Sequence, residues 1–141
     1  AAAGDMPLDD ALPIADAVIL ALPLTPATHH LIDAGRLARM KPSAFLVNVA
    51  RGAVVDQAAL TAALLADRLA GAGLDVLEEE PPDPADPLLA LDTVVLSPHI
   101  AASCPEAVER VALACAEAVI QGLAGDFRDL AVVNPEVLAG R

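Results

Sequence analysis

The chain has 141 residues, the length of one ordinary domain, and a formal net charge of −12 at pH 7. A chain this acidic has no basic stripe for nucleic acid and is repelled by an anionic membrane surface, so we expect neither as a partner. Apolar residues make up 56% of the chain and aromatic residues only 1%, which predicts an aliphatic core.

The four predicted strands are short, continuous apolar runs. They span residues 17–22, 44–49, 72–77 and 93–96. Runs of this length without polar alternation are typical of parallel strands that are covered on both faces. We therefore expect one parallel sheet with both faces buried.

Helical patterns lie between and after these runs. Asp33 is the N-cap candidate of a helix that extends to Met40, and Asp56 that of a helix that extends to about Leu69. The last helix, 103–123, begins at an S-x-x-E capping box and repeats apolar residues at helical spacing. Strands that alternate with helices predict an α/β fold, a Rossmann-like doubly wound parallel sheet.

The two cysteines, Cys104 and Cys115, form neither a C-x-x-C motif nor a metal-ligand set. On one helix, about 16.5 Å of rise separates them, so they cannot form a disulfide with each other. His29 and His30 are adjacent and point to different sides, which does not suit a metal pair. We expect no metal and a reduced cytoplasmic protein, and no signal peptide is visible because the N-terminus lacks a basic region. The chain starts at Ala1 and not at Met, so we expect a fragment or a processed chain.

Ligands of doubly wound sheets bind at the carboxyl ends of the strands. The residues in these positions are Pro23–Thr25, Asn48–Gly52, Asp75 with Glu78–Glu80, and His99. This edge of the sheet is therefore the candidate ligand site.

His99 is a candidate general acid and base, because an imidazole can donate and accept a proton near neutral pH. Its alternative role is a loop histidine that only caps or packs. Arg51 offers a planar fork that matches a carboxylate, and its alternative role is a solvent-facing loop arginine. One carboxylate of the run Glu78–Glu80 could stabilise a charged histidine, but composition does not choose among the three.

An ordered series of motifs resembles the D-isomer-specific 2-hydroxyacid dehydrogenase family over roughly residues 8–123. The motifs occur in the family's order and at close to its spacing. They are Leu22–Pro26, Leu31-Ile32, Met40-Lys41, Asn48–Gly52, Val55-Asp56, Ala58–Leu64, Gly71–Val76, Glu80-Pro81 and Pro98–Ile100.

The resemblance assigns roles to individual residues. It implies that Arg51 grips the substrate's carboxylate and keto oxygen, that His99 donates and accepts the proton, and that Glu80 is the carboxylate partner of His99. Asp75 matches the acid near the nicotinamide carboxamide. The positions that line the cofactor match Pro23, Val49, Ala50, Arg51, Asp75 and His99.

The activity that the resemblance implies is hydride transfer between a nicotinamide cofactor and the C2 carbon of a small D-2-hydroxy or 2-keto acid, such as glyoxylate, hydroxypyruvate or phosphoglycerate. The alternative is an inactive NAD-binding or scaffold module of the same fold. The cofactor implied is NAD, and NADP stays open because the acid that distinguishes the two is not in the chain. The G-x-G-x-x-G motif that precedes this segment in the family is also absent.

The resemblance further implies the domain organisation. Residues 1–123 correspond to the later part of the NAD-binding domain and end in helix 103–123, while residues 124–141 form a tail that returns to the substrate domain. The family commonly pairs through its nucleotide-binding domain, so we expect a homodimer.

Overall fold

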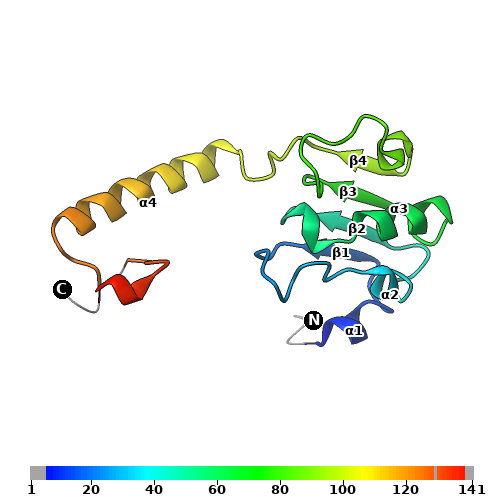
Figure 1. Ribbon diagram of the computed structural model, residues 1–141, viewed down its shortest axis with the longest axis horizontal. Coiled ribbons are helices and arrows are strands. Elements are labelled where there is room, and N and C mark those ends of the chain that lie inside the picture. Colours follow the sequence, from blue (N-terminus) through cyan, green and yellow to red (C-terminus); the bar gives the residue numbers. More distant parts are fainter. Residues whose placement is uncertain (1–5, 129, 139–141) are drawn as a thin grey trace. The chain divides into compact units, whose positions relative to one another are not determined.

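In the computed structural model, which describes residues 6–128 and 130–138, four strands form one parallel sheet in the order β1-β2-β3-β4 (Figure 1). The strands are β1 (Ala17–Leu20), β2 (Phe45–Asn48), β3 (Gly71–Leu74) and β4 (Val94–Leu96). All three neighbouring pairs are parallel. The predicted α/β fold with one parallel sheet is confirmed, with strands one or two residues shorter than their apolar runs.

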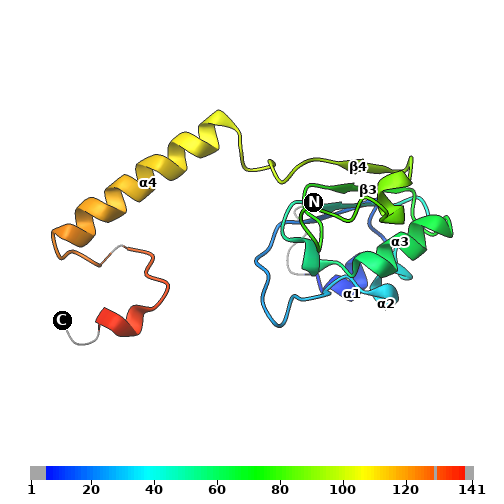
Figure 2. The same cartoon turned by 45° about the horizontal axis from the view of Figure 1, so that its top comes forward.

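Only one face of the sheet is covered within residues 6–101. Alternate side chains of the strands, such as Leu46 and Leu74, are buried on this face. Figure 2 shows helices α2 (Ala34–Leu37) and α3 (Gln57–Leu65) on a single side of the sheet. On the other face, Ile19 is 66% exposed and Val95 is 73% exposed. The expectation of two covered faces is therefore wrong for these residues, because both crossover helices pack on the same side.

The helix starts follow the predicted caps, whereas both helices end earlier than predicted, and α2 ends at Leu37 and not at Met40. Asp33 accepts a hydrogen bond from the backbone of Arg36, and Asp56 accepts one from Ala59. Helix α3 ends at Leu65 and not near Leu69, because Asp67 adopts a left-handed conformation with φ 51°. The backbone N–H of residue 68 then donates to the carbonyl of residue 63, which closes the helix with a Schellman turn.

A short helix, α1 (Leu8–Ala11), precedes the sheet and was not predicted. Residue 12, at its end, is fully buried in the aliphatic core. Two short 3-10 turns, Gly52–Val54 and Pro87–Ala90, lie in the connections after β2 and β3. These turns fix the course of the two loops that leave the carboxyl edge of the sheet.

The long helix α4 spans Pro105–Leu123 and belongs to a second compact unit, which begins at Ala102. Its N-cap is Cys104, and no side chain caps it, so the predicted capping box at Ser103 is wrong. Proline is favoured at the first helical position because its φ is preset and it lacks an N–H group. Pro105 therefore starts the helix, and the N-cap lies one residue later than predicted. A third 3-10 turn, Pro135–Leu138, follows in the same unit.

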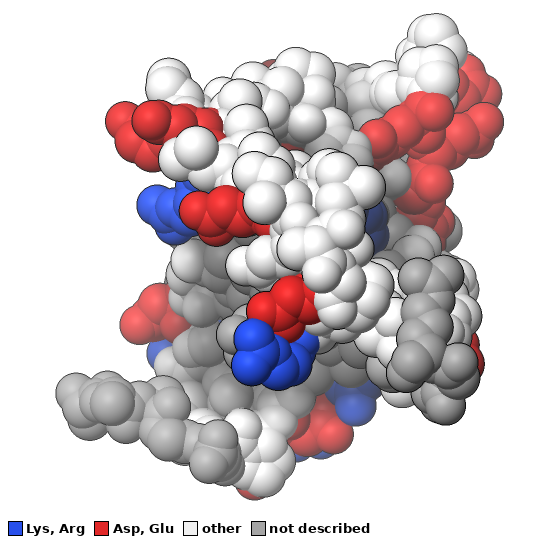
Figure 3. All heavy atoms as spheres, turned by 90° about the vertical axis from the view of Figure 1, so that its left-hand side faces the viewer, with Lys and Arg blue, Asp and Glu red and all other residues white. Residues whose placement is uncertain are grey.

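None of the described helices is long and apolar enough to cross a membrane. Several basic side chains are neutralised locally: Arg36 pairs with Asp9 at 3.0 Å, and Lys41 pairs with Asp16 at 2.8 Å. Figure 3 draws Lys and Arg side chains in blue and Asp and Glu side chains in red.

Gly52 fits only because it has no side chain. A Cβ at this position would overlap the backbone carbonyl of Leu77, which belongs to the neighbouring loop. We expect Gly52→Ala to lower the free energy of unfolding by about 3 kcal/mol, because backbone atoms on both sides must move apart. Gly73→Ala is the matched control, since its Cβ would meet only the side chain of Val47 at 3.7 Å. Equal unfolding midpoints in urea for the two variants would contradict this account.

Candidate active site

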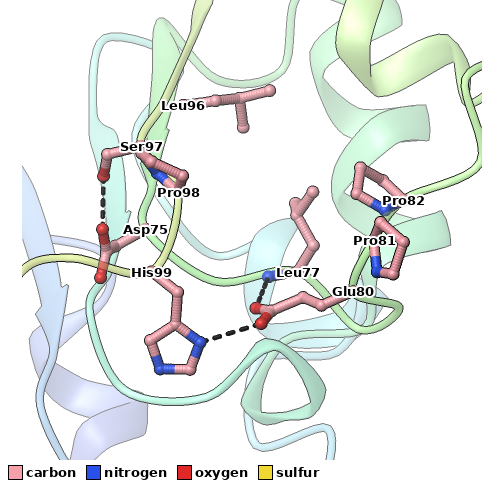
Figure 4. A pocket seen from close by; sticks show the side chains of 9 residues that line it. All are labelled: Asp75, Leu77, Glu80, Pro81, Pro82, Leu96, Ser97, Pro98 and His99. Carbon is pink, nitrogen blue, oxygen red and sulfur yellow. Dashed lines mark hydrogen bonds and ion pairs between the residues drawn. The ribbon is translucent and has the colours of Figure 1, made fainter.

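The loops after β3 and β4 bring the predicted acid–base residues together. Asp75 and Glu80 follow β3, and Ser97 and His99 follow β4. These residues line one cavity of about 500 Å³, whose remaining walls are apolar (Figure 4). The apolar lining residues are Leu77, Pro81, Pro82, Leu96 and Pro98.

The side chains of His99 and Glu80 point toward each other in this cavity (Figure 4). His99 Nδ1 lies 2.9 Å from Glu80 Oε2, and Glu80 Oε1 accepts a hydrogen bond of 3.0 Å from the backbone N–H of Leu77. The bond to His99, followed by the bond from Leu77, holds the pKa of Glu80 below its usual value. An ionised Glu80 only accepts hydrogen bonds, so the proton between the two groups sits on Nδ1 and leaves Nε2 for a ligand.

Asp75 shapes the turn that carries His99. Its Oδ1 accepts bonds from Ser97 Oγ at 2.5 Å and from the Ile100 N–H at 2.9 Å, and its Oδ2 accepts one from the Ala101 N–H at 2.9 Å. The backbone N–H of His99 donates to the Asp75 carbonyl, and His99 itself has φ 55°. This left-handed conformation is strained for a residue with a side chain. The buried carboxylate of Asp75 therefore fixes the backbone on both sides of His99.

Asp75→Asn should change how stability depends on pH. The hydroxyl of Ser97, with the N–H groups of the following turn, lowers the pKa of Asp75 from 3.8. A lowered pKa contributes stability that is present above the unfolded pKa and is lost as the pH falls through the folded pKa. We expect urea unfolding of Asp75→Asn to depend less on pH below about pH 4 than unfolding of the parent. Parallel pH curves for the two proteins would contradict this expectation.

The predicted cofactor residues Pro23, Val49, Ala50 and Arg51 line a second cleft of about 550 Å³ at the ends of β1 and β2. The guanidinium of Arg51 donates to the carbonyl of Ala50 at 2.7 Å. Within residues 6–128 and 130–138 Arg51 makes no ion pair, so no neighbouring carboxylate offsets its charge. The cation stands exposed at the carboxyl edge, as a site for an anionic group requires.

Asn48 fixes this second turn, a role that the sequence reasoning missed. Its side chain is 1% exposed, accepts a bond of 3.0 Å from the Ala50 N–H and donates one of 2.9 Å to the Arg51 carbonyl. A polar residue at the end of a buried strand is the signal that could have identified it, because a buried amide must find hydrogen-bond partners.

The structure thus joins Glu80, Asp75 and His99 in one cavity and places Arg51 in another, together with Pro23. That Arg51 and His99 act on the same substrate, as the resemblance implies, stays a prediction. Of the other two glutamates, Glu78 contacts the ring of His30. No cluster of three or more potential metal ligands occurs among the described residues.

The protein family follows from comparison with known proteins. Residues 2–101 match the family model of the D-isomer specific 2-hydroxyacid dehydrogenase, NAD binding domain. The chain belongs to this family. The resemblance seen in the motifs of the 2-hydroxyacid dehydrogenases is thereby confirmed.

Two curated members of the family show the extent of the match. A glyoxylate reductase of Thermofilum pendens is 48% identical over 134 residues, which is 95% of this chain and 39% of the relative. A glyoxylate/hydroxypyruvate reductase B of Pectobacterium carotovorum is 46% identical, over 93% of this chain and 41% of the relative. The chain therefore spans about two fifths of the length of these relatives.

A solved dehydrogenase shares the fold. The D-isomer specific 2-hydroxyacid dehydrogenase of Xanthobacter autotrophicus Py2, in complex with NADPH and MES, is 42% identical, with a TM-score of 0.76. The match covers 84% of this chain and 48% of that one.

The residues of the second cleft fit part of a nicotinamide dinucleotide. Leu22, Pro23 and Val49 offer an apolar wall for a flat ring, and Arg51 offers a cation for an anionic group. The chain contains no G-x-G-x-x-G motif, so these residues account for one side of such a ligand and not for its pyrophosphate.

Proposed function

We propose that this chain is the catalytic edge of an NAD(P)-dependent D-2-hydroxyacid dehydrogenase that reduces small 2-keto acids, with glyoxylate and hydroxypyruvate as the first candidates. The observation that supports this most strongly is the pairing of His99 Nδ1 with Glu80 Oε2 at 2.9 Å. A scaffold protein does not need a cavity-lining histidine whose Nδ1 is held by a carboxylate.

His99 acts as the general acid in keto acid reduction and as the general base in the reverse reaction. Glu80 orients the imidazole through Nδ1, so that Nε2 presents a proton to the keto oxygen. As the C2 carbon becomes tetrahedral, the oxygen takes this proton from His99 and the substrate leaves as the hydroxy acid.

Arg51 binds the substrate's carboxylate and its keto oxygen. A guanidinium can contact both oxygens at once, which fixes the orientation of the C2 carbon. Its positive charge also favours the negative charge that develops on the keto oxygen during reduction.

The reduced dinucleotide, NADH or NADPH, would supply the hydride for keto acid reduction when it is bound. We propose that Pro23, Val49, Ala50 and Arg51 line its position, and that Asp75 and His99 face it from the neighbouring strand ends. The match to the family's NAD binding domain supports NAD, and the similarity to a dehydrogenase solved with NADPH supports NADP. The residues that distinguish the two are not in this chain.

The remaining proposals concern the setting of the protein. We assign residues 1–123 to the NAD-binding domain and residues 124–141 to a tail that leads back to a substrate domain.

The exposed apolar sheet face with Ile19, Phe45 and Val95 supports a homodimer, which light scattering over a range of concentrations tests. The two free cysteines, Cys104 and Cys115, support a reduced cytoplasmic setting.

The test is the oxidation of NADH and of NADPH by the intact protein with glyoxylate, hydroxypyruvate and phosphohydroxypyruvate. We expect turnover with at least one of the three. Tight binding of the dinucleotide without turnover of any keto acid would instead support the inactive NAD-binding module.

A further inference from the structure

The segment that carries Glu80 has no helix or strand of its own. Residues 77–86 connect the end of β3 to the 3-10 turn at Pro87. A loop of this kind holds a catalytic side chain in place only if other groups fix its backbone. The contacts of this loop with the rest of the fold therefore decide where the carboxylate of Glu80 lies.

The side chain of Gln57 contacts both ends of this loop. Its Oε1 accepts a hydrogen bond of 2.9 Å from the backbone N–H of Glu78, two residues before Glu80. Its Nε2 donates a bond of 2.6 Å to Asp86 Oδ2, at the far end of the loop. The orientation of the amide is unambiguous, because an N–H group only donates and an ionised carboxylate only accepts.

Gln57 is itself firmly anchored. It is the first residue of α3, and the preceding Asp56 caps this helix through the Ala59 N–H. The hydroxyl of Thr61 donates to the Gln57 carbonyl at 2.8 Å, and the side chain of Leu60 is 1% exposed in the core. The side-chain amide of Gln57 thus holds loop 77–86 in a fixed position relative to helix α3.

We propose that Gln57 is a positioning residue for Glu80, and through it for His99. This inference rests on the proposed function of His99 and Glu80. The contacts form a continuous series: Gln57 fixes the Glu78 backbone, the backbone N–H of Leu77 holds Glu80 Oε1, and Glu80 Oε2 holds His99 Nδ1.

The chemistry of this position requires a group that accepts and donates at once and has no charge. A leucine of similar size makes neither bond. A glutamate keeps the acceptor for the Glu78 N–H but sets a second carboxylate against Asp86, and like charges this close repel each other. Glutamine satisfies both partners, which explains its place beside two acidic residues.

The first experiment uses Gln57→Leu in the intact protein. We expect kcat for keto acid reduction to fall about 10-fold, because a small displacement of an acid–base group slows the chemical step. The KM for the dinucleotide should not change. Gln121→Leu is the matched control, since it makes the same chemical change at an exposed position of α4. An equal loss of kcat in Gln121→Leu would overturn the proposal.

A spectroscopic measurement separates this inference from the proposed activity. In ¹⁵N-histidine-labelled chain, the nitrogen shifts of neutral His99 report the fraction of rings that are protonated on Nδ1. Glu80→Ala gives the Nδ1-protonated fraction in the absence of the carboxylate. In Gln57→Leu, this fraction should shift at least halfway from the parent's value toward that of Glu80→Ala. A parent protein without any turnover would sink the proposed function, while an unchanged ring in Gln57→Leu would sink the role of Gln57.

Rescue by charge exchange completes the test. Gln57→Glu should lose both kcat and the Nδ1-protonated fraction, and the added substitution Asp86→Asn should restore most of each, because donor and acceptor are exchanged between the two positions. Asparagine keeps the oxygen that accepts the Leu88 N–H bond at 2.8 Å. Failure of the double variant to recover either signal, although it unfolds at the same urea concentration as the parent, would contradict the proposal.

Discussion

His99→Gln lowers kcat of the intact protein by about 10³-fold for every 2-keto acid that the parent reduces, because general acid catalysis contributes about 10²–10⁴-fold. Glutamine is similar in length and can still bond to Glu80 through its amide, but it cannot transfer a proton at neutral pH. The dissociation constant of the dinucleotide should change less than about twofold, as the substituted group acts on the keto oxygen. Steady-state kinetics and a fluorescence titration with NADH measure the two effects separately.

His29→Gln is the control for this experiment. His29 is exposed and stacks on His30 in the loop after β1, away from the cavity of Glu80. Its substitution should leave kcat unchanged. If His99→Gln also retained turnover, another group would have to supply the proton and the assignment of His99 would be wrong.

Arg51→Lys lowers kcat/KM for the keto acid by about 10²-fold, with a much smaller effect on dinucleotide affinity. Lysine retains the positive charge but loses the planar fork that contacts two oxygens at once. Loss of one charge-assisted contact of about 2–3 kcal/mol corresponds to a factor of this size. Arg51→Ala removes the charge as well and should reduce kcat/KM further.

Arg68→Ala is the matched control for Arg51. Arg68 is exposed and precedes β3, at the opposite edge of the sheet from Arg51. Arg68→Ala changes the net charge by the same amount as Arg51→Ala, without altering the cleft of Arg51. A fall in kcat/KM of the same size in Arg68→Ala would mean that overall charge, and not the position of Arg51, attracts the keto acid.

Much of the sheet could be predicted from short apolar runs, since their length and lack of polar alternation suit parallel strands. The cap residues Asp33 and Asp56 were equally clear, because an N-cap acts on its own first turn. The end of α3 at the left-handed Asp67 was not predictable in this way, because glycine and not aspartate usually marks such an end.

In the candidate site, too, local sequence signals could not predict contacts between residues that are far apart in the chain. Composition could not choose among Glu78, Glu79 and Glu80, and the answer comes from contacts far apart in the sequence. Glu80 meets His99 across 19 positions, whereas Glu78 meets His30 across 48. The family motif at Glu80-Pro81 indicated which glutamate contacts His99, whereas the local sequence could not. The role of Gln57 has no local signal, because both of its partners lie more than 20 residues away.

Hydride transfer by the intact protein is the central claim, and isotope transfer tests it most directly. D-glycerate that carries deuterium at C2 is incubated with the intact protein and NAD, and the products are analysed by mass spectrometry. We predict deuterium in the reduced nicotinamide, unlabelled hydroxypyruvate as the product, no transfer from the L-isomer and almost none with His99→Gln. Absence of transfer from the D-isomer, under conditions in which the protein binds NAD and oxidises no other D-2-hydroxy acid, would contradict the assignment.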